Sequence, residues 1–202
     1  MKVLITCGPT WVPIDDVRVI SNVSTGEMGH LIAGEFLNTG AQVTLIEGAV
    51  THPWSSKGVK VLKYRFFDEL AKLLKQEAGK KYDIIIHAAA VSDFKVAKVS
   101  KSKIDSTRAL DLHLVPVAKL IQSIKKQAPL SFLVGFKLES KLTPAKMAHA
   151  TRSLFVESGC EVVVANTINN GYQGYIINAD GDILAKASRK EILVKHLVKL
   201  LR

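Results

Sequence analysis

The sequence predicts an α/β fold, a three-layer, Rossmann-like arrangement of a mainly parallel sheet with helices on both faces. Six short apolar runs, rich in Val, Ile and Leu, alternate along the chain with segments of helical periodicity. Most of these runs lack a regular alternation of apolar and polar residues, which is typical of strands buried on both faces. A length of 202 residues and a hydrophobic content of 48% suit one domain with a sizeable core, so residues 1–202 are treated as a single domain.

The predicted elements alternate as in a doubly wound sheet. The strands are 2–7, 42–47, 59–64, 82–90, 130–138 and 161–166, and the helices are 27–39, 66–78, 116–127, 143–158 and 188–201. Ligands of such sheets bind beyond the carboxyl ends of the strands. The functional residues are therefore expected in the segments that follow four of these strands, 8–29, 89–103, 135–140 and 165–170.

Several residues mark the expected ends of these helices. Gly40, Gly79 and Gly159 each follow a helical segment, where glycine commonly ends a helix. Thr143, just before a proline, and Ser188 are predicted N-caps, because a hydroxyl can accept a hydrogen bond from the first helical N–H groups.

Two regions interrupt the alternation. Residues 91–115 are long for a connection between strand and helix, and they predict a flap or a two-stranded excursion ending in the alternating run "LDLHLV". Residues 171–187 predict a β-hairpin near the C-terminus, with Asp180-Gly181 as a type I′ turn.

Composition narrows the class of protein. No window approaches 18 consecutive apolar residues, so no transmembrane helix or membrane partner is expected, and the short apolar run at the N-terminus does not predict a signal peptide. Cys7 and Cys160 are far apart with no CxxC pair, which indicates reduced thiols in a cytoplasmic protein. The net charge of +10 suits a protein that binds nucleic acid, an acidic membrane surface or small polyanionic substrates. A lysine-rich surface that is merely solvated explains the charge as well.

Common catalytic motifs are absent from the sequence. There is no GxxxxGK[ST], HExxH, GxSxG or His/Cys metal cluster, and no metal ligand can be named. The turn after the first strand, "ITCGPTWVPID", contains only Gly8 in place of GxGxxG, which disfavours a dinucleotide-dependent oxidoreductase. His87 within an apolar run and Cys7 at a strand end are interpreted as core residues rather than as catalytic groups.

The run "SNVSTGEMG" places small polar residues directly before a predicted helix. Asn22, Ser24, Thr25 and Gly26 lie where unpaired backbone N–H groups favour an anion, and their small side chains would let a phosphate approach closely. An ordinary capped helix explains the run equally well.

Further candidates follow the later strands. Ala89, Ala90 and Asp93 in "AAAVSDF" leave room for a flat ligand and offer a carboxylate to a ribose, a base or Mg²⁺, although close packing and a turn aspartate give the same pattern. Lys101 and Lys103 in "KSKID" could neutralise a triphosphate, or could simply be solvated.

The last two predicted strands are also followed by candidate ligand-binding residues. "VGFKLE" places Phe136 and Lys137 after the fifth strand, where an aromatic ring could stack on a base, and "VVVAN" places Asn166 at the end of the sixth.

Together and in this order, these segments resemble phosphopantothenate–cysteine ligase. The resemblance is carried by "TCGPTWVPIDDVRVISNVSTGEMG", "VTLIEG", "DIIIHAAAVSDF", "KID", "VGFKLES" and "VVVAN", from about residue 5 to residue 166. It implies ligation of 4′-phosphopantothenate to L-cysteine on the way to coenzyme A, through an acyl-nucleotide, with release of pyrophosphate. It also implies CTP or ATP as co-substrate, Mg²⁺, a homodimer with 91–115 as the arm, no flavin, no nucleic-acid partner, and a decarboxylase encoded separately.

The resemblance also assigns roles to the residues already singled out. Asn22 and Lys103 match the catalytic positions, with Lys101 as the competing alignment for the lysine. Ser24, Thr25 and Gly26 match the clamp for the phosphate of the acid. The nucleotide-binding matches are Gly8, Ala89, Ala90, Asp93 and Phe136, and the weaker ones are Lys137, Arg152 and Asn166.

Two departures from the family pattern bear on the choice of nucleotide. "TCGPT" replaces the usual "TSGGT", so Pro9 stiffens the first turn. Two lysines that contact the triphosphate in bifunctional bacterial members are replaced by Leu154 and Ser158, with Arg152 nearby. CTP is slightly favoured over ATP because it is commoner among bacterial members.

Two competing functions stay open from the sequence. A Rossmann-type NAD(P)- or flavin-dependent reductase is consistent with the strand pattern and with "HAAAVSD", and it predicts NAD(P) binding. A basic nucleic-acid-binding module would show salt-sensitive affinity, but the lysines are not interleaved with aromatic residues, which make up only 6% of the chain.

Overall fold

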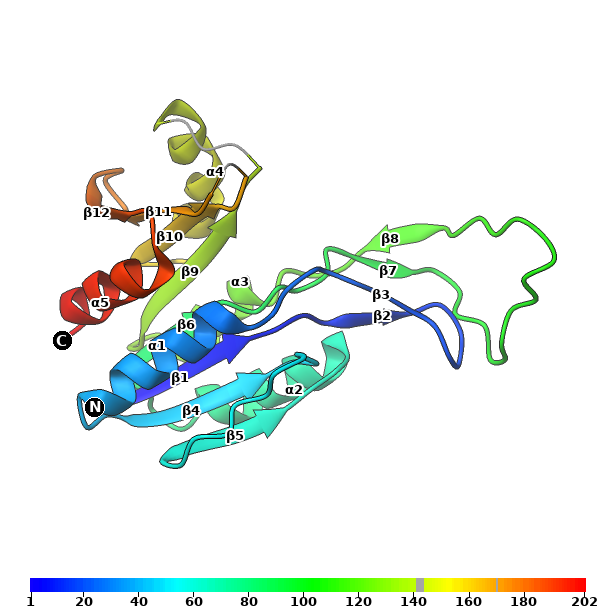
Figure 1. The fold of residues 1–202 in the computed structure, drawn as a ribbon, viewed down its shortest axis with the longest axis horizontal. Coiled ribbons are helices and arrows are strands. Elements are labelled where there is room, and N and C mark those ends of the chain that lie inside the picture. The colour runs from blue at the N-terminus through cyan, green and yellow to red at the C-terminus, as the bar shows by residue number, and fades with distance from the viewer. Residues whose placement is uncertain (141–143, 170) are drawn as a thin grey trace.

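A computed structural model describes residues 1–140, 144–169 and 171–202. Its centre is an eight-stranded sheet in the order β12-β11-β10-β9-β6-β1-β4-β5 (Figure 1). The six parallel strands are β1 (Lys2–Cys7), β4 (Gln42–Glu47), β5 (Val59–Lys63), β6 (Ile84–His87), β9 (Phe132–Leu138) and β10 (Val162–Thr167). The antiparallel strands β11 (Gln173–Asn178) and β12 (Ile183–Ala187) extend one edge. The predicted fold class is confirmed.

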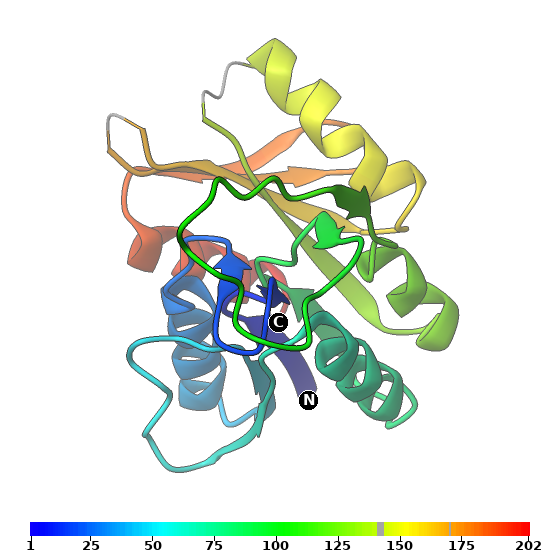
Figure 2. The same cartoon turned by 90° about the vertical axis from the view of Figure 1, so that its right-hand side faces the viewer.

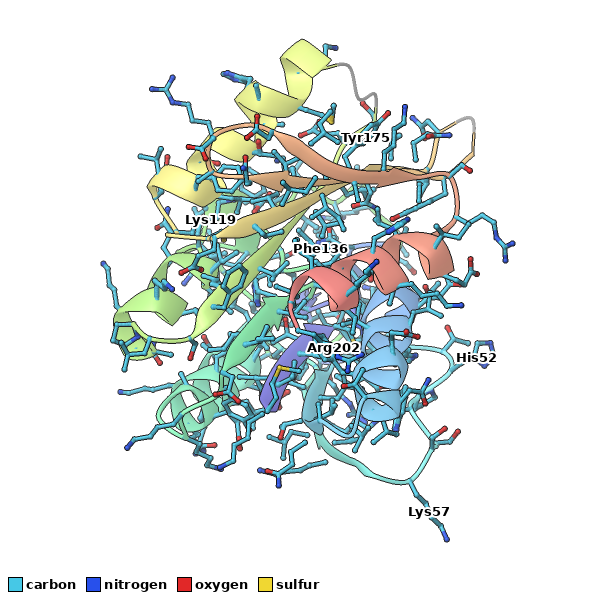
Figure 3. The ribbon with its side chains drawn as sticks, turned by 90° about the vertical axis from the view of Figure 1, so that its left-hand side faces the viewer. His52, Lys57, Lys119, Phe136, Tyr175 and Arg202 are labelled. Atoms are coloured by element: carbon cyan, nitrogen blue, oxygen red, sulfur yellow. The ribbon has the colours of Figure 1, made fainter. Side chains whose placement is uncertain are left out.

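Helices cover both faces of the sheet (Figure 1). Helices α1 (Glu27–Asn38) and α5 (Lys190–Leu200) share one face, where Phe36 and Leu197 belong to the same buried cluster. Helices α2 (Phe67–Ala78), α3 (Ile121–Gln127) and α4 (Pro144–Val156) cover the other, with Leu70, Ile124 and Met147 buried against the strands. Side chains fill the space between these layers, whereas Lys57 of the β4–β5 loop points into solvent (Figure 3).

Two short hairpins project beyond the carboxyl ends of the parallel strands (Figures 1 and 2). One pairs β7 (Phe94–Val96) with β8 (Leu114–Pro116), which confirms the two-stranded form of the 91–115 excursion. The other pairs β2 (Trp11–Pro13) with β3 (Val19–Ser21), and the sequence did not reveal it, because three-residue strands carry no measurable periodicity. We call the two hairpins and the loop 97–113 the arm.

A buried carboxylate ties the two hairpins of the arm together. Asp15 accepts hydrogen bonds from the backbone N–H groups of Ile104, at 3.0 Å, and Arg18, at 2.7 Å. The guanidinium of Arg18 bonds both to Asp15, at 2.9 Å, and to the carbonyl of Ile104, at 3.0 Å. These partners, the Ile104 N–H first, lower the pKa of Asp15. The loop next to Lys103 is therefore fixed to the first hairpin.

The ends of the helices correct several details of the prediction. α1 and α4 end as expected, with Gly40 and Gly159 in left-handed conformation at φ 79° and 66°. Gly79 instead stays right-handed, and Lys81 takes the left-handed conformation at φ 54°. Ser188 is not an N-cap, because α5 begins at Lys190 and its N-cap position is occupied by Arg189.

Two further predictions differ or fall outside the description. The helix expected at 116–127 begins only at Ile121, because Pro116 belongs to β8. The predicted cap Thr143 and the end of segment 165–170 lie outside the described residues.

The C-terminal hairpin is confirmed, but its turn is not of type I′. A type I′ turn needs positive φ at both central residues, and here only Gly181 has it, at 89°. The N–H of Gly181 bonds to the carbonyl of Asn178 at 3.1 Å, and the N–H of Asn178 bonds to the carbonyl of Asp182 at 3.1 Å. This pattern is the three-residue loop in which a left-handed glycine follows a tight turn.

Gly29 allows α1 to approach β1, which predicts a large effect of one methyl group on stability. A Cβ at Gly29 would lie 2.3 Å from the Cβ of Cys7, whereas a Cβ at Gly34 on the same helix would meet only Trp54, at 3.7 Å. Gly29→Ala is expected to lower the free energy of unfolding by about 3 kcal/mol or more, because helix and strand must separate. Gly34→Ala is the control and should raise it by about 0.5–1 kcal/mol. Urea unfolding measures both, and equal effects would contradict the close contact.

Candidate active site

The candidate site lies where the order of the strands reverses. From β1 the chain builds β4 and β5 on one side, and it then crosses to β6 on the other side. Such a switch point leaves a crevice beyond the carboxyl ends of the two central strands. Here the chain stays paired past the strands, with the N–H of Ala90 bonded to the carbonyl of Gly8 at 2.9 Å and the N–H of Thr10 bonded to the carbonyl of Ala90 at 3.3 Å.

On one side of the switch point, a loop of small residues leads into α1. Gly26 stands at the N-cap position with φ 74° and has no side chain to cap the helix. The hydroxyl of Thr25 accepts a long hydrogen bond, 3.4 Å, from the N–H of Glu27. The first N–H groups of a helix otherwise lack partners within the helix and favour an anion. This geometry is compatible with an anion at the start of α1, and residues 24–26, the candidate for that role, are called the anion-binding loop below.

Asn22 connects this loop with the end of β6. Its side-chain amide nitrogen donates hydrogen bonds to the carbonyls of Ala90, at 3.1 Å, and Val91, at 3.3 Å. Both donors of the amide are thereby used, and only its oxygen is left to accept a hydrogen bond from a ligand. Asn22 therefore stands between the anion-binding loop and the segment that contains Ala89, Ala90 and Asp93.

On the other side of the switch point, a cleft of about 220 Å³ lies between the ends of β6 and β9, the start of α3 and the helix α4. Four predicted residues line it: Ala89, Asp93, Phe136 and Lys137. The two positions that depart from the bacterial pattern, Leu154 and Ser158, line it as well. We call this the β6–β9 cleft.

Lys119 is a residue of the cleft that the sequence analysis missed. It lines the β6–β9 cleft and forms a close ion pair with Asp93, and more than half of each side chain is exposed. In the sequence it stands in the apolar run "VPVAKLIQSI", which falls within the predicted helix 116–127. The sequence pattern therefore does not identify Lys119 as a residue of a loop at a strand end. Figure 3 shows its place beside the strand that contains Phe136.

Other predicted residues lie apart from the cleft. Gly8 is buried near Gly26, since a Cβ at either glycine would meet the same methyl group of Val50 at 2.8 Å. Arg152 lines a neighbouring hollow with Lys137. Asn166 is an internal residue of β10, where its carbonyl accepts the N–H of Glu139 at 2.9 Å.

Lys101 and Lys103 are both exposed, and both stand in the loop of the arm. Figure 1 shows this loop at the far end of the two hairpins, well away from the body of the domain that carries the β6–β9 cleft.

Burial explains two side chains that were interpreted as core residues. His87 bonds through Nδ1 to the hydroxyl of Thr6 at 2.9 Å, and burial lowers its pKa to about 4, so the imidazole is neutral at pH 7. Burial raises the pKa of the Cys7 thiol to about 12, so Cys7 is protonated and is not a nucleophile. Both interpretations are confirmed.

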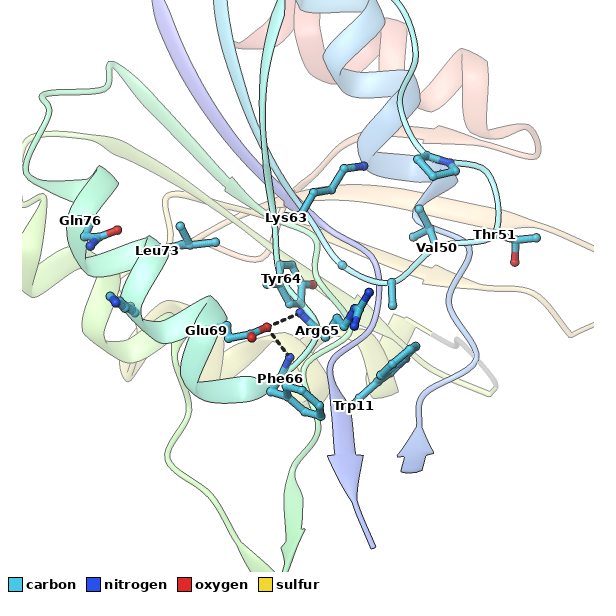
Figure 4. Close-up of a pocket in the computed structure, with 14 residues that line it drawn as sticks. Trp11, Val50, Thr51, Lys63, Tyr64, Arg65, Phe66, Glu69, Leu73 and Gln76 are labelled. Carbon is cyan, nitrogen blue, oxygen red and sulfur yellow. Dashed lines mark hydrogen bonds between the residues drawn. The ribbon is translucent and has the colours of Figure 1, made fainter. Parts of the chain in front are cut away.

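A larger cleft, of about 930 Å³, lies beyond β4 and β5 and along α2 (Figure 4). Its wall includes Lys63, Arg65 and Trp11, and the guanidinium of Arg65 lies 5.8 Å from the centre of the Trp11 ring. Glu69 is already bonded to the backbone N–H groups of Arg65 and Phe66. None of the predicted site residues lines this cleft, so size alone does not identify the site.

The fold defines a doubly wound α/β protein with a crevice at the switch point of the sheet, which is where proteins of this class generally bind their ligands. Within that class, the chain belongs to the family of the DNA/pantothenate metabolism flavoprotein C-terminal domain, whose profile matches residues 1–199. The coenzyme A biosynthesis bifunctional protein CoaBC of Thermococcus kodakarensis is 40% identical over 168 residues, 83% of this chain and 41% of that protein. The chain spans about half the length of the curated relatives it matches.

Two solved structures have the same fold. The DNA/pantothenate metabolism flavoprotein from Streptococcus pneumoniae superposes with a TM-score of 0.88 at 24% identity, over 100% of this chain and 98% of that one. The Cab2 mutant H337A, in complex with phosphopantothenate-cysteine, gives a TM-score of 0.79 at 19% identity, over 99% and 86%. No helix within the described ranges is long and apolar enough to cross a membrane.

Proposed function

We propose that this chain is a phosphopantothenate–cysteine ligase of coenzyme A biosynthesis. The observation that carries the proposal is the side chain of Asn22, which bonds to the end of β6 while its backbone leads into the anion-binding loop. Asn22 thus joins the loop proposed for the phosphate to Val91, which lines the β6–β9 cleft proposed for the nucleotide. The names of the relatives support the same pathway, and the Cab2 structure contains phosphopantothenate-cysteine.

The two substrates would occupy the two sides of the switch point. The phosphate of 4′-phosphopantothenate would lie at Ser24, Thr25 and Gly26, on the N–H groups that begin α1. The nucleotide would lie in the β6–β9 cleft, with its base on Phe136 and its phosphates near Lys119. The carboxylate of the acid and the α-phosphate of the nucleotide would then meet beside Asn22.

The reaction has two steps. In the first, the carboxylate of phosphopantothenate attacks the α-phosphorus of CTP, slightly favoured here over ATP, and pyrophosphate leaves. In the second, the amine of L-cysteine attacks the acyl carbon, an amide bond forms, and the nucleoside monophosphate leaves. Lysine ammonium groups favour the first step, because they neutralise the negative charge that develops on the leaving pyrophosphate.

Mg²⁺ would accompany the triphosphate. This ion is usually held by one or two carboxylates together with phosphate oxygens and water. Asp93 and Glu157 are carboxylates that line the β6–β9 cleft, so the residues present fit the ion.

The arm would complete the site in a homodimer. It exposes large apolar side chains, among them Phe94 at 52% and Leu114 at 41%, which a second copy of the chain would cover. Since Lys101 and Lys103 lie at the far end of the arm, they would act in the site of the partner subunit. A fully active monomer at assay concentration would contradict this arrangement.

Pyrophosphate release tests the proposed activity. The protein is incubated with phosphopantothenate, Mg²⁺ and either CTP or ATP, with and without cysteine. We expect sustained release of pyrophosphate only with cysteine present, and the nucleotide that supports it is the co-substrate. No release with either nucleotide would overturn the proposal. Titration with NAD(P)H, expected to give no fluorescence change, tests the competing reductase function.

Lys119 predicts a specific effect on the affinity for the nucleotide. Lys119→Ala is expected to raise the KM for the nucleotide about 10-fold, because the phosphates lose an ammonium group at the mouth of the cleft. Turnover at saturation should change little. Lys126→Ala, which removes an exposed lysine from α3, is the control. Equal KM values for wild type and both variants would exclude Lys119 from the nucleotide site.

A further inference from the structure

A cluster of three potential metal ligands lies outside the β6–β9 cleft. Cys7 and Glu47 are the last residues of the neighbouring parallel strands β1 and β4, and they face one another in register. His30 stands in the first turns of α1, directly above them. One ligand atom from each residue lies within 4.8 Å of the other two, in the only such group of three among the residues that the structure describes.

The packing of α1 brings this cluster together. Gly29 lies so close to Cys7 that a Cβ there would approach the Cβ of Cys7 to 2.3 Å. The next residue, His30, is therefore carried onto the ends of β1 and β4. Cys7 and Glu47 are both fully buried, while the side chain of His30 keeps 19% of its surface exposed.

Glu47 is a buried carboxylate with cationic and N–H partners. Its oxygens accept hydrogen bonds from Nε2 of His30 at 2.6 Å and from the backbone N–H of Trp54 at 2.8 Å, and Lys63 forms a close ion pair with it. A carboxylate without water needs such neutralisation. The neutralising cation is replaceable, because 53% of the Lys63 side chain is exposed and it lines the 930 Å³ cleft.

We propose that Cys7, His30 and Glu47 bind a divalent ion of the zinc class, with Lys63 swinging into the 930 Å³ cleft when the ion enters. Thiolate, imidazole and carboxylate are each ordinary ligands of zinc, and a site of three protein ligands leaves a fourth position for water. The ligand atoms of a tetrahedral site lie about 3.3–3.7 Å apart, as follows from the Zn–S and Zn–N bond lengths. The cluster thus needs only small side-chain movements.

Protons and charge balance in this exchange. The metal displaces the thiol proton of Cys7, which leaves for solvent. The neutral ring of His30 moves its one proton from Nε2 to Nδ1, so that Nε2 can bind the ion. Thiolate and carboxylate together neutralise the dication, while the ammonium of Lys63 passes into solvent. A sulfur ligand selects zinc-class ions over Mg²⁺, so this site is distinct from the ion that accompanies the nucleotide. The inference therefore does not depend on the proposed ligase activity.

The position of the cluster gives the ion a structural role. Cys7 lies directly beneath the anion-binding loop, because a Cβ at Gly26 would be 3.6 Å from its Sγ. An ion held by the three residues would fix the end of β1, the end of β4 and the start of α1 to one another.

Titration of the metal-stripped protein with Co²⁺ tests the proposal. We expect a thiolate-to-cobalt charge-transfer band with one equivalent bound, its loss on addition of Zn²⁺, and no competition from Mg²⁺. Cys7→Ser should abolish the band. It should also weaken Zn²⁺ binding by more than about 10- to 100-fold, the loss expected when a residue that only hydrogen-bonds to a metal ligand is removed. Cys160→Ser, which removes the other buried thiol, is the control and should change neither.

Lys63 supplies a test that does not depend on removing a ligand. Lys63→Met should tighten Zn²⁺ binding at least about 10-fold, because it removes a positive charge that competes for Glu47. The absence of a charge-transfer band in the wild type, or its persistence in a folded Cys7→Ser variant, would overturn the metal site. The cluster would then be a buried ion-pair network only.

Discussion

Lys103→Ala is expected to lower turnover about 10²- to 10³-fold, the loss that follows when one group stabilising the developing charge is removed. Lys101→Ala should cost much less, because Lys103 is one residue from Ile104, which is fixed to Asp15 and Arg18, whereas Lys101 is farther from this anchor. The assay is pyrophosphate release under saturating substrates. Lys98→Ala, an exposed lysine of the same arm, controls for the loss of charge. A large loss in Lys101→Ala alone would reverse the assignment of the lysine.

Mixing two inactive variants distinguishes action within one subunit from action across a dimer. If Lys103 serves the site of the partner subunit, dimers that contain one Lys103→Ala chain and one Asn22→Ala chain have one site with both residues intact. Random exchange of subunits should then restore about a quarter of wild-type turnover. If both residues belong to the site of the same chain, each site of a mixed dimer lacks one of the two residues, and mixing should restore no turnover.

The covalent pair makes the distinction absolute. A linked dimer with both substitutions on one chain keeps a complete site only if Lys103 acts within its own subunit, since across the dimer each site would lack one residue. A linked dimer with one substitution on each chain keeps a complete site only if Lys103 acts across the dimer. Half of wild-type turnover in the first dimer and almost none in the second would contradict the proposed arm exchange.

The buried strands and long helices were predictable because their signal is local. Val-, Ile- and Leu-rich runs bounded by turn residues located every parallel strand of the sheet, and Gly40 and Gly159 marked helix ends through their left-handed conformation. The hairpin of β2 and β3 escaped because its three-residue strands carry no periodicity and because its anchor lies far along the chain. Asp15, which fastens it to Ile104, bridges 89 residues, and no short window contains such a contact.

The same distinction applies to the candidate site. The loop before α1 and the residues after β6 could be found because each stands at the end of an element with a clear pattern. Lys119 and the cluster of Cys7, His30 and Glu47 could not, since their partners come from different elements that only the fold brings together. His30 in particular looks like any polar residue of an amphipathic helix until the approach of α1 to β1 is known.

Asn22→Ala is expected to separate the two steps of the proposed reaction. The carboxylate and the α-phosphate still have their own binding groups, so the first step should proceed and release about one pyrophosphate per site in a burst. The second step should then slow about 10²-fold, because the acyl-nucleotide loses the amide beside it and a small misplacement of the reacting atoms has an effect of this size. Rapid-quench measurement of pyrophosphate against final product resolves burst and steady state.

The contacts of Asn22 explain why Asn22→Ala should slow the second step without unfolding the protein. Its hydrogen bonds to Ala90 and Val91 are exposed to solvent, so their removal should lower the free energy of unfolding by only about 1 kcal/mol. Asn38→Ala, an exposed asparagine at the opposite end of α1, is the control and should leave both steps unchanged. Wild-type turnover in Asn22→Ala would refute the role of this residue. Because the proposal rests on the reach of Asn22 from the anion-binding loop to the end of β6, that result would also remove the reason for placing both substrates in one site.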